Sequence, residues 1–175
     1  MSLFALFLFV GCSIPADNSI EFETQDFSLF TPFTLTRNTE IEQQGANTVN
    51  KRHGKPVDVK LYSGSGNNCM MMVSSTNYHS KLTRDNLIGA NVGSILNVDK
   101  TRSIEDIVSR INFRTENDIL YSILEYSTIR KGYHILMNSG SCLSGESIHS
   151  VMIICQDTQQ NRNLAKKIIE SFKCK

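Results

Sequence analysis

The sequence predicts an α+β fold, an antiparallel β-sheet packed by helices. Segments with strand periodicity are grouped between two helical segments in the second half of the chain. The links between these strands are short and rich in turn-forming residues, as in hairpins. About 160 residues remain after an apolar leader, which is enough for one domain with its own core.

The first half of the domain is expected to contain three strands. Residues 26–36 carry apolar side chains at alternate positions, and Pro32 places this strand at a sheet edge or splits it in two. Residues 38–56 are polar, contain two glycines and are expected to form a loop. Residues 57–62 and 69–75 are expected to be strands joined by SGSGNN, and the methionines at 70–72 are expected to fill the core.

Residues 78–92 are ambiguous between helix and loop, and a clear helix is expected to start after them. Ser103 is placed to cap this helix, with Asp106 at the reciprocal capping position. The apolar face of the helix would consist of Ile104, Ile107, Val108 and Ile111.

The second half reads as an antiparallel run followed by a helix. Strands are expected at 119–127, 133–137 and 148–155, with a turn at 130–132 and a Ser/Gly-rich loop at 138–147. Asp157 or Thr158 would cap the last helix. Its buried face would consist of Leu164, Ala165, Ile168, Ile169 and Phe172.

The chain begins with the apolar run MSLFALFLFVGC, which is too short to cross a bilayer but has the length of a signal-peptide core. Its end, Phe9-Val10-Gly11-Cys12, resembles a bacterial lipobox. This resemblance implies that residues 1–11 are a signal peptide, that Cys12 is lipidated, that 12–25 form a tether and that 26–175 form the domain. The alternatives are a secretory signal cleaved after Ala16 and a buried N-terminal strand or helix.

Charge distribution argues against nucleic-acid binding. Acidic residues gather between Asp17 and Glu42, whereas the basic residues that follow are scattered. Neither a concentrated basic stripe nor an aromatic stacking platform is visible. The only basic doublets are Lys51-Arg52, Arg130-Lys131 and Lys166-Lys167.

Four cysteines follow Cys12, and an even number in an exported chain indicates two disulfides. A final helix that folds back over the preceding strand would run about 22 Å, against about 23 Å for the strand. Cys174 would then lie near Cys142 and far from Cys155, and Cys69 would pair with Cys155 if their strands are adjacent. The cysteines are too widely spaced for a zinc site, and neither a metal nor another cofactor is expected.

The turn and strand KGYHILMN, the strand IHSVMIIC and the helix end IIESFK resemble the close of the PsbP-like fold, and FSLFTPFTL is similar to its opening strand. The resemblance covers residues 26–173. It implies an antiparallel sheet sandwiched by helices and a role as an accessory or interaction module, and it transfers no catalytic residue.

Cys142, Ser144 and His149 lie close together in GSCLSGESIHS and suggest a hydrolase or thiol enzyme. The segment lacks a G-x-S-x-G nucleophile elbow, and a disulfide-bearing loop with an exposed serine is the preferred interpretation. The histidines are dispersed, without the paired spacing of metal ligands. They are His53, His79, His134 and His149.

The sequence therefore predicts an extracytoplasmic lipoprotein that is held to membrane lipid through Cys12. We expect a non-enzymatic domain that binds a protein partner in an envelope-associated complex. The alternative is a small secreted hydrolase or thiol enzyme that uses the segment from Cys142 to His149.

Overall fold

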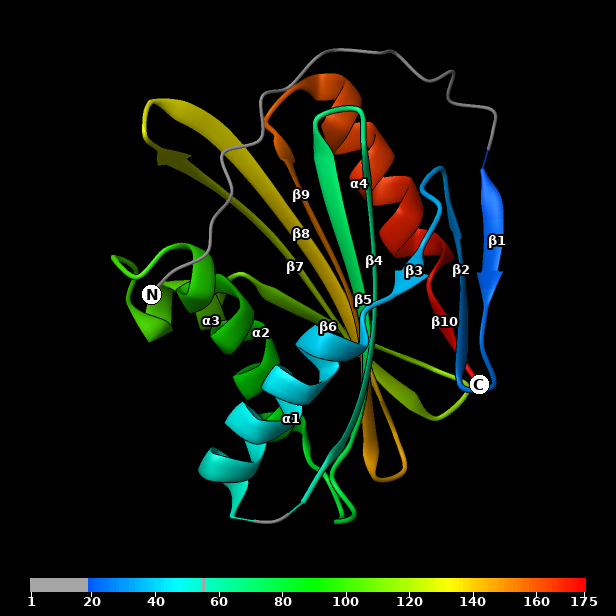
Figure 1. The fold of residues 1–175 in the computed structure, drawn as a ribbon. Coiled ribbons are helices and arrows are strands. Elements are labelled where there is room, and N and C mark those ends of the chain that lie inside the picture. The colour runs from blue at the N-terminus through cyan, green and yellow to red at the C-terminus, as the bar shows by residue number, and fades with distance from the viewer. Residues whose placement is uncertain (1–18, 55) are drawn as a thin grey trace.

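The computed structural model describes residues 19–54 and 56–175, which adopt a mixed α+β fold of antiparallel sheets and helices (Figure 1). The predicted signal peptide, Cys12 and the first part of the predicted tether lie outside these residues. No helix in the described part of the chain is long and apolar enough to span a membrane. The elements in chain order are β1 (Ile20–Glu23), β2 (Phe27–Thr31), β3 (Thr36–Arg37), α1 (Thr39–His53), β4 (Asp58–Gly66), β5 (Cys69–Asn77), α2 (Arg84–Val98), α3 (Ile104–Ser109), β6 (Ile111–Glu116), β7 (Ile119–Arg130), β8 (Tyr133–Ser144), β9 (Ser147–Gln156), α4 (Gln159–Ser171) and β10 (Lys173–Cys174).

Two antiparallel sheets form the frame. The large sheet has the strand order β3-β4-β5-β9-β8-β7-β6, and the small one has the order β1-β2-β10. Other elements lie over both faces of the large sheet (Figure 1). Helix α4 and the small sheet lie over one side, here called the closed face, whereas α1, α2 and α3 lie over the other, here called the open face.

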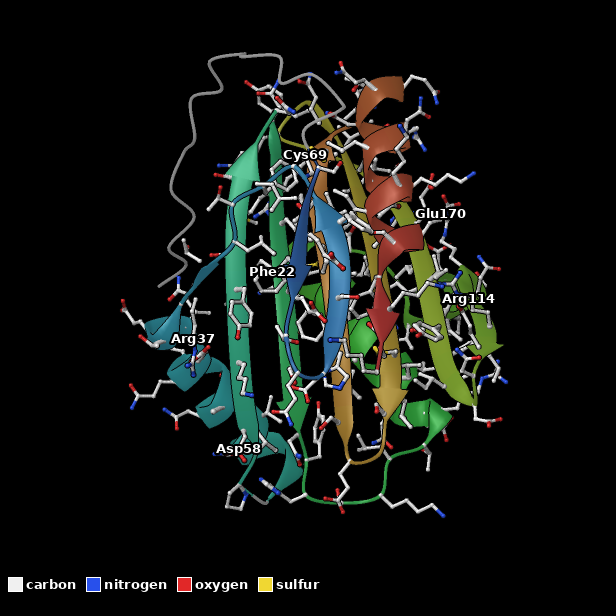
Figure 2. All side chains as sticks on the ribbon, turned by 90° about the vertical axis from the view of Figure 1, so that its right-hand side faces the viewer. Phe22, Arg37, Asp58, Cys69, Arg114 and Glu170 are labelled. Carbon is white, nitrogen blue, oxygen red and sulfur yellow. A yellow bond between two sulfur atoms is a disulfide. The ribbon has the colours of Figure 1, made fainter. Side chains whose placement is uncertain are left out.

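The closed face buries a core of rings and aliphatic side chains. Figure 2 shows α4 and the small sheet in front of the large sheet. Thr158 caps α4 by accepting a hydrogen bond from the backbone N–H of Asn161 at 3.2 Å. Ala165, Ile168, Ile169 and Phe172 are buried and Leu164 is partly buried against the same core, so the predicted face of this helix is confirmed.

The predicted loop at 138–147 is wrong, because most of it belongs to the central strand β8. Small residues are needed there since both faces of this strand are covered closely. A Cβ atom on Gly140 would lie 3.3 Å from Cγ2 of Ile169 on α4. On the opposite face, Ser139 donates a hydrogen bond to Asn91 of α2 at 2.9 Å. Serine and glycine here reflect tight packing between layers, not a turn.

The predicted loop at 38–56 is also wrong, since most of it forms α1. The side chain of Asn38 caps this helix by accepting a hydrogen bond from the N–H of Ile41 at 3.1 Å. Gly54 ends it with a φ of 73°, which glycine adopts without strain. Apart from Ile41, which is exposed, the helix has few large apolar side chains, so the periodic signal is weak.

The remaining differences concern boundaries. The strand predicted at 26–36 is split at Pro32 into β2 and β3, one of the two outcomes that the proline allowed. Strand β1 lies inside the predicted tether, because it pairs with β2 as part of the small sheet. Ser103 caps α3 as predicted, but this helix is short, and Ile111 is buried as the first residue of β6.

Candidate functional site

The candidate residues Cys142 and His149 are directly opposite each other in the register of β8 and β9. Both side chains face the closed side of the sheet, where His149 contacts the ring of Phe27 at a centroid distance of 5.7 Å. Cys142 and His149, which are close in the sequence, are therefore also close in space. The chemistry of the pair depends on what else holds each side chain.

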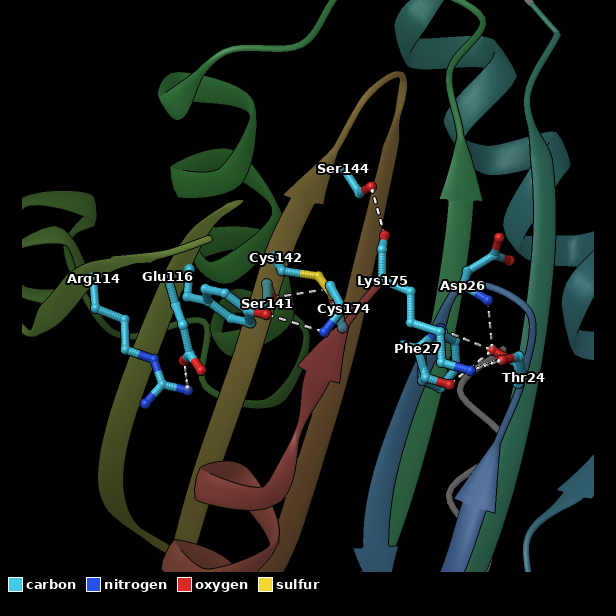
Figure 3. The surroundings of a disulfide bond; sticks show 12 residues. Thr24, Asp26, Phe27, Arg114, Glu116, Ser141, Cys142, Ser144, Cys174 and Lys175 are labelled. Carbon is cyan, nitrogen blue, oxygen red and sulfur yellow. Dashed lines mark hydrogen bonds and ion pairs between the residues drawn. A yellow bond between two sulfur atoms is a disulfide. The ribbon is translucent and has the colours of Figure 1, made fainter. Parts of the chain in front are cut away.

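Cys142 is engaged with the C-terminal strand (Figure 3). The sulfur atoms of Cys142 and Cys174 lie at disulfide distance, with the Cα atoms 6.6 Å apart. Cys69 and Cys155 form a second pair, directly opposite each other in β5 and β9, with Cα atoms 4.1 Å apart. These are the pairs that helix and strand lengths favoured. A sulfur in such a bond is not available as a thiolate nucleophile.

Ser144 lies two residues further along β8, beside the end of the chain. Its hydroxyl donates a hydrogen bond to the backbone carbonyl of Lys175 at 3.3 Å (Figure 3). It also lines a shallow hollow of about 570 Å³ together with Lys81, Asp118 and Glu146. Ser144 and His149 are not hydrogen bonded to each other in the described part of the chain, so the serine has no imidazole base.

His149 is a buried residue, only 3% exposed. Its Nδ1 atom is buried without a hydrogen-bond partner among the described residues. Burial lowers the pKa of His149, an effect partly opposed by the carboxylate of Asp26 and reinforced by Lys60. The imidazole is therefore held in its neutral form, behind Phe27 and away from solvent.

The other histidines are dispersed, as the sequence predicted. His79 pairs through Nε2 with the carboxylate of Asp58 at 2.8 Å, and His134 is exposed on β8. The side chain of His53 lies outside the described residues. Within the described ranges, no group of three or more histidine, cysteine, aspartate or glutamate side chains could hold a metal ion.

SGSGNN forms the hairpin between β4 and β5 and not a phosphate-binding loop. Asn67 and Asn68 make the turn with φ angles of 51° and 57°. Gly64 has a different role, because a Cβ atom there would lie 2.6 Å from the carbonyl oxygen of Thr34. The turn interpretation of this motif is therefore correct, although β4 extends to Gly66.

The most organised polar cluster in the described residues surrounds Asp99, which follows α2. The carboxylate accepts hydrogen bonds from the hydroxyls of Thr101 at 2.6 Å, Thr128 at 2.8 Å and Tyr126 at 2.9 Å. The hydrogen bond from Thr101 and those from Thr128 and Tyr126 lower the pKa of Asp99, against the opposing effect of burial. The cluster fastens the end of α2 to β7. Sequence reasoning missed it, because its members are far apart in the chain and follow no motif.

Three methionines form a stripe on the open face of the sheet. Met72 of β5 is directly opposite Met152 of β9, and Met70 lies two residues before Met72 on the same face. All three are partly exposed, whereas Met71, on the closed face, is fully buried. The prediction that 70–72 fill the core therefore holds in full only for Met71. We call Met70, Met72 and Met152 the methionine stripe.

Comparison with known proteins adds no family. No protein-family model matches the chain, and no curated protein matches it at a significant level. The function therefore has to be argued from the chemistry and geometry of the residues themselves.

Proposed function

We propose that the protein is a bacterial lipoprotein, anchored to the extracytoplasmic side of a membrane through Cys12, whose domain binds a protein partner in an envelope complex. In this proposal the domain is a non-enzymatic accessory module of the kind that the PsbP-like resemblance implies. Its four remaining cysteines stabilise the fold, and its surface carries the function.

The two cysteine pairs are the observation that carries the proposal. Stable disulfides form outside the reducing cytosol, so the pairs Cys69–Cys155 and Cys142–Cys174 are compatible with an extracytoplasmic domain. The apolar leader that ends in Gly11-Cys12 supplies the export signal and the lipid attachment site. Two independent features of the chain thus point to the same side of the membrane.

The methionine stripe supports a role in binding a protein. Methionine side chains are flexible and polarisable, and they are frequent at surfaces that adapt to a partner. The stripe lies on strands β5 and β9, between the part of the open face that α1 contacts through β4 and the part that α2 contacts through β7 and β8. A partner that packs on this strip would complete a layer that is otherwise only partly covered.

The lipid anchor is tested by metabolic labelling with a palmitate analogue. The wild type should be labelled and Cys12→Ser should not, because the thiol of Cys12 is the attachment point. Ser13→Ala is the matched control and should keep the label. Equal labelling of the wild type and Cys12→Ser would contradict the lipoprotein proposal.

Partner binding at the stripe is tested by site-specific photocross-linking in the producing cell. A benzophenone amino acid in place of Met72 should give one adduct of defined mass. The same amino acid in place of Thr48, which is exposed on α1, should not. If both positions give the same adducts or neither gives any, the stripe is not the binding surface.

The proximity of Cys142 and His149 keeps a hydrolase or thiol enzyme as the second candidate. Counting free thiols in the exported protein separates the two functions. A free thiol at Cys142 would favour the enzyme, whereas its absence leaves only Ser144 as a nucleophile. Labelling by a serine-reactive phosphonate that is lost in Ser144→Ala would then support the enzyme and contradict the accessory module.

A further inference from the structure

The hairpin that joins β7 and β8 extends beyond its neighbours in the sheet. The ladder between β8 and β9 ends at Ile135, and the ladder between β6 and β7 ends at Leu124. The hairpin turns at Lys131 and Gly132, both with positive φ, and in the strand ladders residues 129–134 pair across β7 and β8. A further backbone bond at this end runs from the N–H of Asp157 to the carbonyl of His134, at 2.9 Å. Figure 1 shows this tip at the upper left, projecting past the helices of the open face.

The tip presents large apolar side chains to solvent. Ile129 and Tyr133 are 65% and 67% exposed, the two highest values among the exposed large apolar residues of the described chain. Ile129 pairs with His134, and Tyr133 pairs with Arg130, so the two apolar side chains lie on opposite faces of the hairpin. A hairpin tip with apolar side chains on both faces is suited to inserting into a lipid bilayer, whereas binding to a flat protein surface would use only one of these faces.

The turn of the hairpin carries only basic side chains, and the carboxylate of Asp99 lies further down, where it accepts a hydrogen bond from Thr128. Residues 126–135 contain Arg130 and Lys131 and no aspartate or glutamate. Just below the tip, a hollow of about 270 Å³ is lined by Arg102, Ile129 and His134 together with two hydroxyl side chains. Tyrosine and lysine are typical of the membrane interface, where an apolar body meets the lipid and a polar end stays with the headgroups.

The place where the chain enters the domain is compatible with such a contact. The start of β1 and the hairpin tip lie in the same, upper half of Figure 1. The segment from Cys12 to Ile20 can span at most about 28 Å when fully extended. An anchor at Cys12 would therefore keep this half of the domain within a short distance of the headgroups.

We propose that the β7–β8 hairpin tip is a second membrane contact, in which Ile129 and Tyr133 enter the interface of an anionic bilayer while Lys131 at the turn faces the headgroups. This inference rests on the proposed membrane-anchored function and gives the domain a fixed orientation. An orientation of this kind would leave the methionine stripe, on the side of the sheet, free for a protein partner.

The chain has no tryptophan, so a single introduced indole reports on its own surroundings. We would reconstitute the mature full chain with Tyr133→Trp into vesicles of phosphatidylcholine with or without phosphatidylglycerol. In the anionic vesicles the emission should shift to the blue, and brominated lipid should quench it. Ile129→Trp provides a second position if Tyr133→Trp fails to fold. The matched control is Ile41→Trp, at a position that is 44% exposed on α1, and Figure 1 shows this helix below the tip. This variant should show neither effect.

A further variant tests whether the contact with anionic vesicles requires the positive charge of Lys131. Lys131→Gln in the Tyr133→Trp background should lower the equilibrium constant for contact with anionic vesicles about fivefold, because each cation near such a surface contributes a similar increment. Raising the salt concentration should weaken the contact in the same direction. Equal quenching in neutral and anionic vesicles would overturn the assignment of anionic headgroups.

The labelling and fluorescence results together distinguish a failure of the hairpin contact from a failure of the lipid anchor. Suppose that the chain is labelled at Cys12 but that the indole emission of both Tyr133→Trp and Ile129→Trp is unquenched in every vesicle. That outcome would overturn the hairpin contact and leave the anchor standing, and the tip would then be a surface for a protein. A chain that carries no lipid and still shows quenching at the tip would support the contact and overturn the anchor.

Discussion

The two faces of the large sheet are built differently. On the closed face, Phe27, Leu29 and Phe172 pack against the sheet with at most 1% of their surface exposed, and the bond from Cys142 to Cys174 ties the end of the chain to the central strands. On the open face, α2 is held partly by a buried polar chain. The amide of Asn91 donates to Ser122 at 2.8 Å and accepts from Ser139 at 2.9 Å.

This difference shows how one sheet can serve two purposes. Apolar packing is not directional, so the closed face gains stability from area and from covalent links. Buried hydrogen bonds fix position more than they add net stability, and they cost free energy when one partner is removed. The open face thus holds α2 in register while the methionine stripe beside it stays partly exposed.

The largest expected effect concerns the link between β5 and β9. The double variant Cys69→Ser and Cys155→Ser removes a bond between residues 86 positions apart, which should cost about 4–5 kcal/mol in the chain-entropy account. The double variant Cys142→Ser and Cys174→Ser, with a separation of 32, should lose about 3–4 kcal/mol. Urea unfolding without reductant measures both. A link between Cys155 and Cys174 in non-reducing peptide mapping would contradict the pairing and the fold-back of α4.

Next in size is the closed-face core. Phe172→Ala removes a ring that is 1% exposed and lies 5.8 Å from the ring of Phe27, so the free energy of unfolding should fall by about 3–5 kcal/mol. The control Ile41→Ala, at an exposed position, should change it by less than about 0.5 kcal/mol. Equal effects of the two variants would mean that α4 does not seal this face.

A smaller effect is expected from the polar chain on the open face. Asn91→Ala leaves the hydroxyls of Ser122 and Ser139 buried without this partner, which should cost about 1–3 kcal/mol. Ser94→Ala, on the same helix, removes only a bond to the carbonyl of Ala90 and is the matched control. Adding Ser122→Ala and Ser139→Ala to an Asn91→Leu variant should restore part of the loss. If it does not, the network is not what holds α2.

Sequence reasoning recovered the closed face better than the open face. The repeating apolar positions of α4 and the near-continuous apolar run of β9 identify each element from its own segment alone. The lengths of this helix and this strand also place Cys174 near Cys142, so they predict that pairing. The open face includes α1 and one side of β8, and the sequence predicts α1 and most of β8 as loops. Helix α1, between its caps at Asn38 and Gly54, is mostly polar, and the small residues of β8 are of the kind that loops contain. Their structure is set by tertiary contacts that periodicity does not report.

The candidate residues show the same limit. The proximity of Cys142 and His149 was visible in the sequence, but the burial of His149 behind Phe27 depends on a strand more than a hundred positions earlier in the chain. The Asp99 cluster was missed for a related reason, and the turn at 130–132 was predicted without its projection beyond the neighbouring strands. A hydrogen-bonded carboxylate, and the distance to which a turn projects, depend on residues elsewhere in the chain, which local spacing does not report.

Acid should affect the open face through Asp99. Its folded pKa is lowered, so its contribution is present above the unfolded value near 3.8 and is lost as the pH falls toward the folded pKa. Asp99→Asn should lose about 1 kcal/mol at pH 7, since one of the accepting oxygens is replaced by a donor. Unfolding curves of the two proteins should converge as the pH falls from about 4 toward 2. A difference that stays constant over this range would contradict the charged state of Asp99.

The smallest expected effect is a loss of stability in mild acid through His149 on the closed face, at a higher pH than the effect of Asp99. Because burial lowers the pKa of His149, the unfolded chain takes up a proton below its value near 6.5 while the folded chain resists. The wild type should therefore lose stability between pH 7 and pH 6, by at most about 0.7 kcal/mol. His149→Gln should show a flatter profile, and the exposed control His134→Gln should follow the wild type. Parallel profiles for all three proteins would mean that the imidazole of His149 takes up its proton as readily in the folded chain as in the unfolded one. A flattened profile for His149→Gln alone would mean that proton uptake by His149 in the unfolded chain causes the loss of stability in mild acid, at a pH where the carboxylate of Asp99 is still charged.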